Sequence, residues 1–83
     1  MRESIRLACA LSQITGEVLH ERQRFPERMA SHHVAYAVIQ GDLYRLQAHC
    51  TTCARESNPD ELRRALTHIA ATACRALEDL KLV

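Results

Sequence analysis

The scarcity of helix-breaking residues constrains this chain more than any other feature of its sequence. The 83 residues include only two glycines and two prolines, so the segments between them are long and uninterrupted. Glycine and proline are the residues that most disfavour a helix interior, and chains that lack them sustain long helices. Within these segments the apolar residues recur at helical spacing. The sequence therefore predicts an all-α fold.

The first predicted helix extends from about Glu3 to Arg24. Its apolar side chains recur every three or four positions and so share one helix face: Leu7, Leu11, Ile14 and Val18. Pro26 limits this helix, because the residue before a proline is displaced from helical backbone angles.

The second predicted helix begins after Ser31, a residue type that caps helix N-termini well. It continues to about Cys53 or Arg55. Gly41 lies inside it, where a glycine costs about 1 kcal/mol relative to alanine. This glycine either permits a close backbone approach or is simply tolerated.

The third predicted helix has the clearest start. Asn58 can cap it, Pro59 suits its first position, and two acidic residues, Asp60 and Glu61, complement the positive end of the helix dipole. Its apolar face then extends almost to the end of the chain, through Leu62, Leu66, Ile69, Ala70, Ala73, Leu77 and Leu80.

These three helices predict one domain spanning residues 1–83, folded as an antiparallel three-helix bundle. Aromatic residues make up only 4% of the chain, so the core must consist of Leu, Ile, Val and Ala. A core of this kind in so short a chain supplies little stability. We therefore expect a second copy of the chain to complete the bundle as a homodimer.

The charge and hydropathy of the chain exclude several classes of partner. The net charge of +1 disfavours nucleic acid, whose binding proteins usually carry a clear basic excess. There is no apolar stretch of membrane-spanning length, and the first residues lack the apolar centre of a signal peptide. A cytoplasmic location is expected, where the four cysteines remain reduced.

Three stretches of the sequence resemble one family. They are GEVLHERQRFPER, then SHHVAYAVIQGDLYRL, and then RRALTHIAATACRALEDL, the last of which matches the pattern AA-x-A-x-RA-x-EDL. Their order and spacing resemble the small, phage-type members of the MazG-like all-α nucleoside triphosphate pyrophosphohydrolases. Members of this family hold Mg²⁺ with carboxylates from two facing helices and hydrolyse nucleotides between the α and β phosphates.

The residues that would carry this chemistry are largely replaced. In the family, five acids form the site: three in an E-E-x-x-E motif and two on the third helix. The resemblance places the three motif positions at Gly41, Asp42 and Arg45, and the two on the third helix at Ala65 and His68. Only Asp42 is a carboxylate, and one carboxylate does not hold two Mg²⁺ ions. The resemblance therefore implies a catalytically degenerate protein without a magnesium cofactor.

The replacing residues suggest a different ligand. Arg45 and His68 would stand where metal-binding acids stood, and Arg64 lies one helical turn from His68. Such a cleft is expected to bind an anion without metal, for example a nucleotide or an acidic protein segment. In the alternative interpretation Arg45 pairs with Asp42 or Asp79, and His68 is a half-buried helix residue.

Three functional hypotheses follow. In the first, the chain is a regulatory or interaction module, encoded by a phage or mobile element, that acts by binding a protein partner or a nucleotide. In the second, it is a divergent metal-dependent pyrophosphohydrolase that uses Asp42, Glu61 and further acids, either from the first helix (Glu17 or Glu21) or from a partner chain.

The third hypothesis concerns a C-x-x-C motif formed by Cys50 and Cys53. Such a pair can ligate zinc or act as a redox couple. No second motif of this kind is present, and no strand is predicted before it as in thioredoxin-like proteins. Burial of both thiols on one helix face is the simpler interpretation.

Overall fold

The computed structural model of the protein describes residues 2–51 and 58–83. Within these ranges all regular structure is helical, in three helices: α1 (Arg2–Arg24), α2 (His32–Thr51) and α3 (Pro59–Asp79). The prediction of an all-α chain with three helices is confirmed for this part of the sequence. The predicted helix starts agree with the structure to within one residue, whereas the predicted end of the second helix lies outside the described residues.

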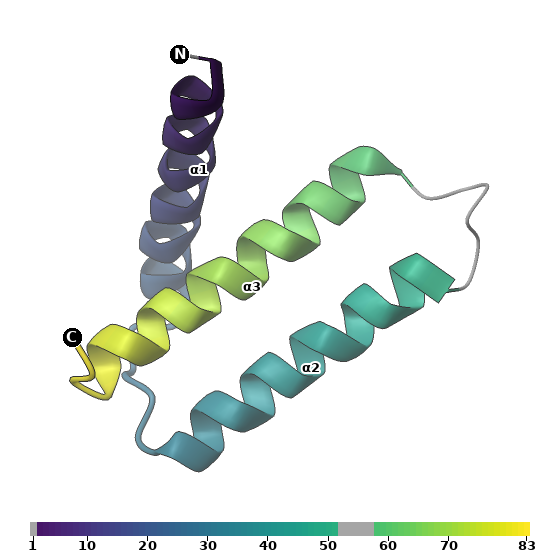
Figure 1. Ribbon diagram of the computed structural model, residues 1–83. Helices are drawn as coiled ribbons and strands as arrows, with labels where there is room; N and C mark the ends of the chain where they lie inside the picture. The colour runs from purple at the N-terminus through teal and green to yellow at the C-terminus, as the bar shows by residue number, and fades with distance from the viewer. Residues whose placement is uncertain (1, 52–57) are drawn as a thin grey trace.

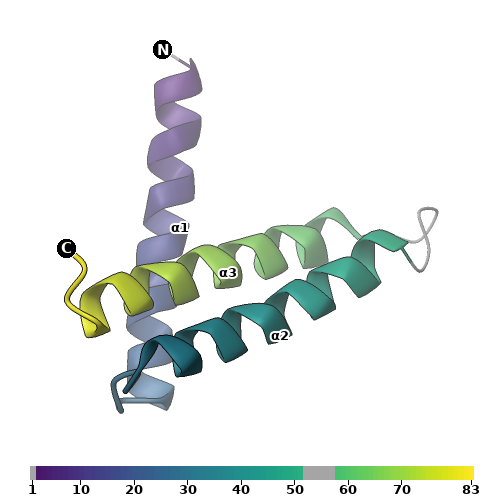
Figure 2. The same ribbon diagram turned by 60° about the horizontal axis from the view of Figure 1, so that its bottom comes forward.

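Helix α3 is the central element of the molecule. It packs against both α1 and α2, which do not contact each other. Helices α2 and α3 lie side by side and antiparallel, and α1 crosses α3 steeply while its N-terminal half projects away (Figures 1 and 2). Only the C-terminal half of α1 therefore contributes to the packed part of the molecule.

The core is thin and consists of small residues. The buried apolar side chains are Val18, Ala35, Ala71 and Ala76. The larger apolar residues expected in an aliphatic core are mostly exposed, among them Leu7 (60%) and Leu11 (53%) on α1. Small side chains let the helix backbones approach closely, but they remove little apolar surface from water. Polar contacts must therefore contribute to holding the helices together.

Two charged residues of α3 hold the connection between α1 and α2. The Arg75 guanidinium donates hydrogen bonds to the carbonyl oxygens of Phe25 (2.8 Å) and Glu27 (3.0 Å). The Asp79 carboxylate accepts a hydrogen bond from the Met29 backbone N–H (3.1 Å) and lies 3.3 Å from the Arg22 guanidinium. These contacts fix the C-terminal end of α1 against α3.

The surroundings of Asp79 determine its ionisation. Burial alone would raise the pKa of this carboxyl, but hydrogen bonds from the Met29 backbone N–H and the Arg22 guanidinium outweigh that effect and hold the pKa below 3.8. A hydrogen bond to Glu78 likewise raises the pKa of Arg22. The contacts around Asp79 therefore favour its charged form.

Two of the helices have the predicted caps. The Asn58 side-chain oxygen accepts a hydrogen bond from the Asp60 backbone N–H (2.9 Å), and the Ser31 hydroxyl accepts one from the Val34 N–H (3.3 Å). Among the described residues, no helix has the length and apolarity that crossing a membrane requires.

Candidate functional site

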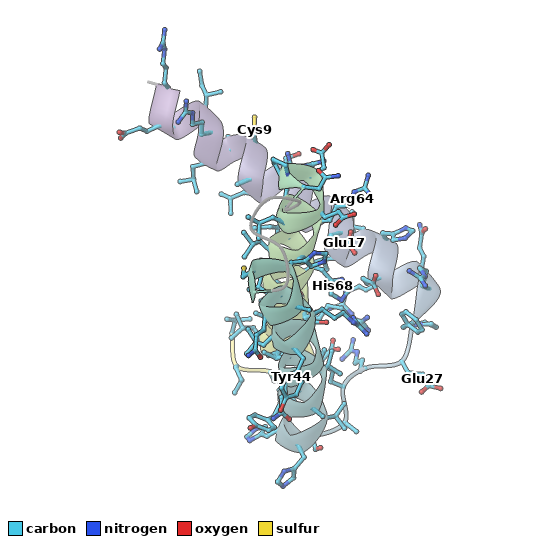
Figure 3. The ribbon with its side chains drawn as sticks, turned by 90° about the vertical axis from the view of Figure 1, so that its right-hand side faces the viewer. Cys9, Glu17, Glu27, Tyr44, Arg64 and His68 are labelled. Carbon is cyan, nitrogen blue, oxygen red and sulfur yellow. The ribbon has the colours of Figure 1, made fainter. Side chains whose placement is uncertain are left out.

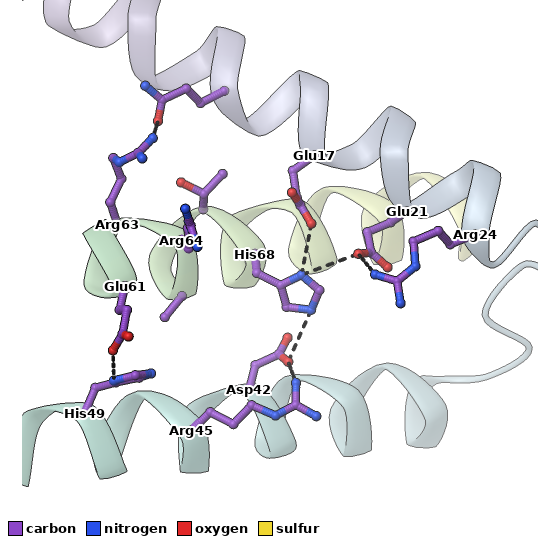
Figure 4. Close-up of a pocket in the computed structure, with 13 residues that line it drawn as sticks. Glu17, Glu21, Arg24, Asp42, Arg45, His49, Glu61, Arg63, Arg64 and His68 are labelled. Atoms are coloured by element: carbon purple, nitrogen blue, oxygen red, sulfur yellow. Dashed lines mark hydrogen bonds and ion pairs between the residues drawn. The ribbon is translucent and has the colours of Figure 1, made fainter. Parts of the chain in front are cut away.

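An open cleft of about 780 Å³ lies where the C-terminal half of α1 faces α2 and α3. Figure 4 shows the polar side chains that gather in it. All of the residues that line this cleft except Ala65 are charged or polar: Gln13, Glu17, Glu21, Arg24, Asp42, Arg45, His49, Glu61, Arg63, Arg64, Thr67 and His68. Four acidic residues and four arginines are among them, so the formal charge of the cleft is balanced.

His68 of α3 is the centre of the acidic part of the cleft (Figure 4). Its Nδ1 atom lies 3.3 Å from Glu17 Oε1 and 3.9 Å from Glu21 Oε1, both on α1. Its Nε2 atom lies 3.4 Å from Asp42 Oδ1 on α2. Glu17 and Glu21 are one helical turn apart, so their side chains project from the same face of α1. Each of the three helices thus contributes to one cluster, which we call the His68 cluster.

Asp42 is the most enclosed member of the His68 cluster, with a side chain that is 4% exposed. Its Oδ2 atom accepts a hydrogen bond from the Thr72 hydroxyl (3.0 Å), which also lies 3.0 Å from the backbone oxygen of His68. Its Oδ1 atom accepts a hydrogen bond from the Arg45 guanidinium (3.3 Å). Asp42 therefore connects α2 to α3 and fixes the orientation of the imidazole.

Four exposed arginines surround the acidic cluster: Arg24, Arg45, Arg63 and Arg64. Three of them pair with carboxylates: Arg24 with Glu21 (3.9 Å), Arg45 with Asp42 (3.3 Å) and Arg63 with Asp60 (3.6 Å). The fourth, Arg64, makes no ion pair or hydrogen bond with any residue that the structure describes. The Arg63–Asp60 pair is exposed on both sides and contributes about 0–1 kcal/mol, so the Arg63 guanidinium is readily shared with a ligand.

The predicted anion-binding residues Arg45, Arg64 and His68 all line this cleft. Figure 3 shows Glu17, Arg64 and His68 together where α1 crosses α3, with Cys9 and Tyr44 outside this region. Arg45 also pairs with Asp42, which is the arrangement that the alternative interpretation expected.

The predicted pair of Asp42 and Glu61 is not brought together. Glu61 lies against His49, 3.5 Å from its Nδ1 atom, at the other end of the cleft from the His68 cluster. Glu17 and Glu21, expected only as substitute acids for a metal site, both contact His68 instead. Their spacing of four residues on one helix was the signal that could have placed them together.

The C-x-x-C motif is described only in part, because Cys53 lies outside the described residues. Cys50 is an exposed free thiol, so the predicted burial is wrong for this residue, and Cys9 is also exposed. Cys50 lies on an exposed part of α2, where no apolar side chain of the described residues buries it.

The His68 cluster also has the composition of a metal site. One ligand atom from each of Glu17, Glu21 and His68 lies within 4.8 Å of the other two. A pair of Mg²⁺ ions needs several oxygen donors together, and this arrangement does not fit that requirement. Both oxygens of Asp42 already face protein groups, and Glu61 is directed elsewhere.

No protein-family model, curated protein or solved structure matches the chain.

Proposed function

We propose that this protein is a binding module whose cleft takes a phosphorylated small molecule of the nucleotide class. The observation that carries this proposal is the set of four arginines around one cleft, of which Arg64 has no partner among the described residues. A guanidinium donates two parallel hydrogen bonds to phosphate oxygens, and each such contact is charge-assisted. A ligand that displaces the exposed contact of Arg63 with Asp60 loses little in exchange.

The replacement of the MazG-type acids supports binding rather than hydrolysis. Arg45 and His68 stand at positions that the resemblance assigns to metal-binding carboxylates. The one retained acid, Asp42, is 4% exposed and accepts hydrogen bonds from Arg45 and Thr72. We therefore retain the idea of a catalytically degenerate MazG-like protein with a regulatory role, acting in the cytoplasm and encoded by a phage or mobile element.

Calorimetric titration with ATP, dUTP and inorganic pyrophosphate, in EDTA and again with Mn²⁺, tests this proposal. Binding in either condition is expected, with at least a tenfold loss of affinity in Arg64→Gln and in Arg45→Gln. Arg28→Gln is the matched control, because Arg28 is exposed but lies outside the cleft. Absence of heat with every ligand in both conditions, or equal affinity in all variants, would overturn the proposal.

A divergent pyrophosphohydrolase is the second candidate. It is favoured by the convergence of Glu17, Glu21 and Asp42 on His68 from three helices. Release of pyrophosphate from a panel of deoxynucleoside triphosphates with Mn²⁺ or Mg²⁺, abolished in Glu17→Gln, would replace the binding proposal with this one. No release above the rate of the Glu17→Gln variant would exclude it.

We also propose that the chain forms a homodimer through α1. Ile5, Leu7 and Leu11 are more than half exposed on the projecting half of this helix. An isolated helical segment of this length is marginally stable in water. Covering these side chains with the same segment of a second copy would remove the exposed apolar surface and stabilise the helix.

A further inference from the structure

We propose that Glu17, Glu21 and His68 bind one first-row transition-metal dication of the series from Mn²⁺ to Zn²⁺. This site goes beyond the proposed binding of a phosphorylated ligand and does not depend on it. It shares only the His68 position with the magnesium centre of the MazG-like family, its two carboxylate ligands come from α1 instead, and it is independent of the C-x-x-C motif.

The geometry of the three ligand atoms suits a single ion. Ligands about 2.0–2.2 Å from a common metal ion lie about 3–3.5 Å apart at tetrahedral or octahedral edges. The Nδ1 atom of His68 is 3.3 Å from Glu17 Oε1 and 3.9 Å from Glu21 Oε1. The three ligand atoms all lie within 4.8 Å of one another, so small side-chain rotations would close the set around one ion.

Asp42 supplies the outer partner that a metal-binding histidine needs. Metal-ligating histidines usually donate their second ring N–H to a carboxylate, which fixes the tautomer and the ring orientation. The Nε2 atom of His68 faces Asp42 Oδ1 at 3.4 Å, on the opposite side of the ring from Glu17 and Glu21. Asp42 is itself held in place by Arg45 and Thr72.

With the hydrogen of His68 on Nε2, the lone pair of Nδ1 and one carboxylate oxygen each from Glu17 and Glu21 face one another. The only ion pair that either carboxylate makes with an arginine among the described residues is the 3.9 Å contact of Glu21 with Arg24. A cation between the three atoms converts their repulsion into attraction.

The donor set determines which metal is favoured. Mg²⁺ and Ca²⁺ prefer all-oxygen sites, whereas imidazole nitrogen shifts the preference toward the later first-row metals such as Fe²⁺, Ni²⁺ and Zn²⁺. Three protein ligands leave at least one coordination position open. That position faces a cleft of about 780 Å³ with arginines around it, where a water molecule or a phosphate oxygen could complete the coordination.

Titration of EDTA-stripped protein with Co²⁺, followed by visible absorption and calorimetry, tests the site without any phosphorylated ligand. We expect one Co²⁺ per chain, displaceable by Zn²⁺ but not by equimolar Mg²⁺, with no thiolate-to-cobalt charge-transfer band. A strong thiolate band, or no binding at millimolar Co²⁺, would overturn the proposal.

Single substitutions then assign the ligands. Glu17→Gln and His68→Gln should each weaken Co²⁺ binding at least tenfold, and Asp42→Asn should weaken it about 10- to 100-fold as an outer partner. Glu61→Gln is the matched control, because it removes a cleft acid that faces His49 instead.

Circular dichroism verifies that each variant folds. Because Asp42 is buried, Glu17→Gln and His68→Gln decide the outcome if Asp42→Asn does not fold. Unchanged affinity in these two variants would contradict the site. Since no phosphorylated ligand is present, failure here leaves the arginine variants of the nucleotide titration unaffected, and the two proposals can fail separately.

Discussion

At the scale of single residues, the packing of the helices depends on buried charged side chains that are hydrogen-bonded to other parts of the chain. Arg75 and Asp79 of α3 form hydrogen bonds with backbone groups between Phe25 and Met29. These groups lie between α1 and α2 and are therefore not part of the backbone hydrogen bonding of a helix. Within residues 2–51 and 58–83, the Nε atom of Arg75 is the exception, because it is buried and has no hydrogen-bond partner there. Removing one partner of a buried polar contact costs more than the contact itself contributes, because the other group stays desolvated.

Asp79 should make the free energy of unfolding depend on pH. Its pKa is lowered in the folded state, so its contribution is complete above the unfolded value of about 3.9 and is lost as the pH falls through the folded pKa. Asp79→Asn should cost about 1–3 kcal/mol at neutral pH and should flatten the loss of stability below pH 4. Urea unfolding between pH 2.5 and 7 measures both effects.

The control for this experiment is Glu78→Gln, which removes the neighbouring exposed partner of Arg22. It should change stability by less than about 1 kcal/mol. Equal effects of the two substitutions would show that the burial of Asp79 is unimportant.

At the scale of helices, local signals explain where each element begins and how well it forms. The Asn58 cap of α3 is the best defined, with its side-chain oxygen 2.9 Å from the Asp60 N–H. Asn58→Ala should therefore cost about 1 kcal/mol, because that N–H loses its acceptor. Thermal unfolding followed by circular dichroism measures the change. Asn58→Asp retains an acceptor oxygen and should restore most of the stability; an equal loss in both would argue against capping.

Gly41 within α2 is tolerated rather than required. A Cβ atom added there would meet nothing within 4 Å, so no close backbone approach explains the glycine. Gly41→Ala should stabilise the protein by about 0.5–1 kcal/mol through better helix propensity. The urea midpoint should rise, as it should for Gly16→Ala in α1, where the space is equally open. A loss of stability at Gly41 alone would indicate that the neighbouring Asp42 cannot tolerate the change.

At the scale of the whole molecule, the most prominent apolar surface that no other described helix covers lies on α1. The N-terminal half of this helix projects away from the packed part of the molecule (Figure 1). This half carries the exposed apolar side chains of Ile5, Leu7 and Leu11. Full burial of a leucine contributes about 1.5–3 kcal/mol, so a symmetric contact through several of them could sustain a dimer.

We expect light scattering to give twice the 9.4 kDa mass of one chain. Replacing both Leu7 and Leu11 by Glu should return the monomer mass, because the charged side chains cannot be covered. Arg6→Glu changes the charge of the same segment without removing apolar surface and should preserve the dimer. A monomer mass for the unaltered chain at 100 μM would contradict the dimer proposal.

The sequence by itself determined the helices, because their signals are local. The scarcity of breakers, the apolar periodicity and the caps at Ser31 and Asn58 depend on neighbours within one turn, and the structure reproduces each start. Which apolar side chains are buried could not be predicted in the same way. Leu7 and Leu11 have the spacing of a buried face, yet α1 crosses α3 and leaves them uncovered.

Only the tertiary structure decided what the cleft contains. Glu17, Asp42 and His68 come from three helices, and nothing in their spacing specifies that they meet. Their meeting depends on the angle at which α1 crosses α3, which the buried contacts of Arg75 and Asp79 help to fix. A site assembled from distant segments follows from packing geometry, whereas a cap or a helix follows from the residues beside it.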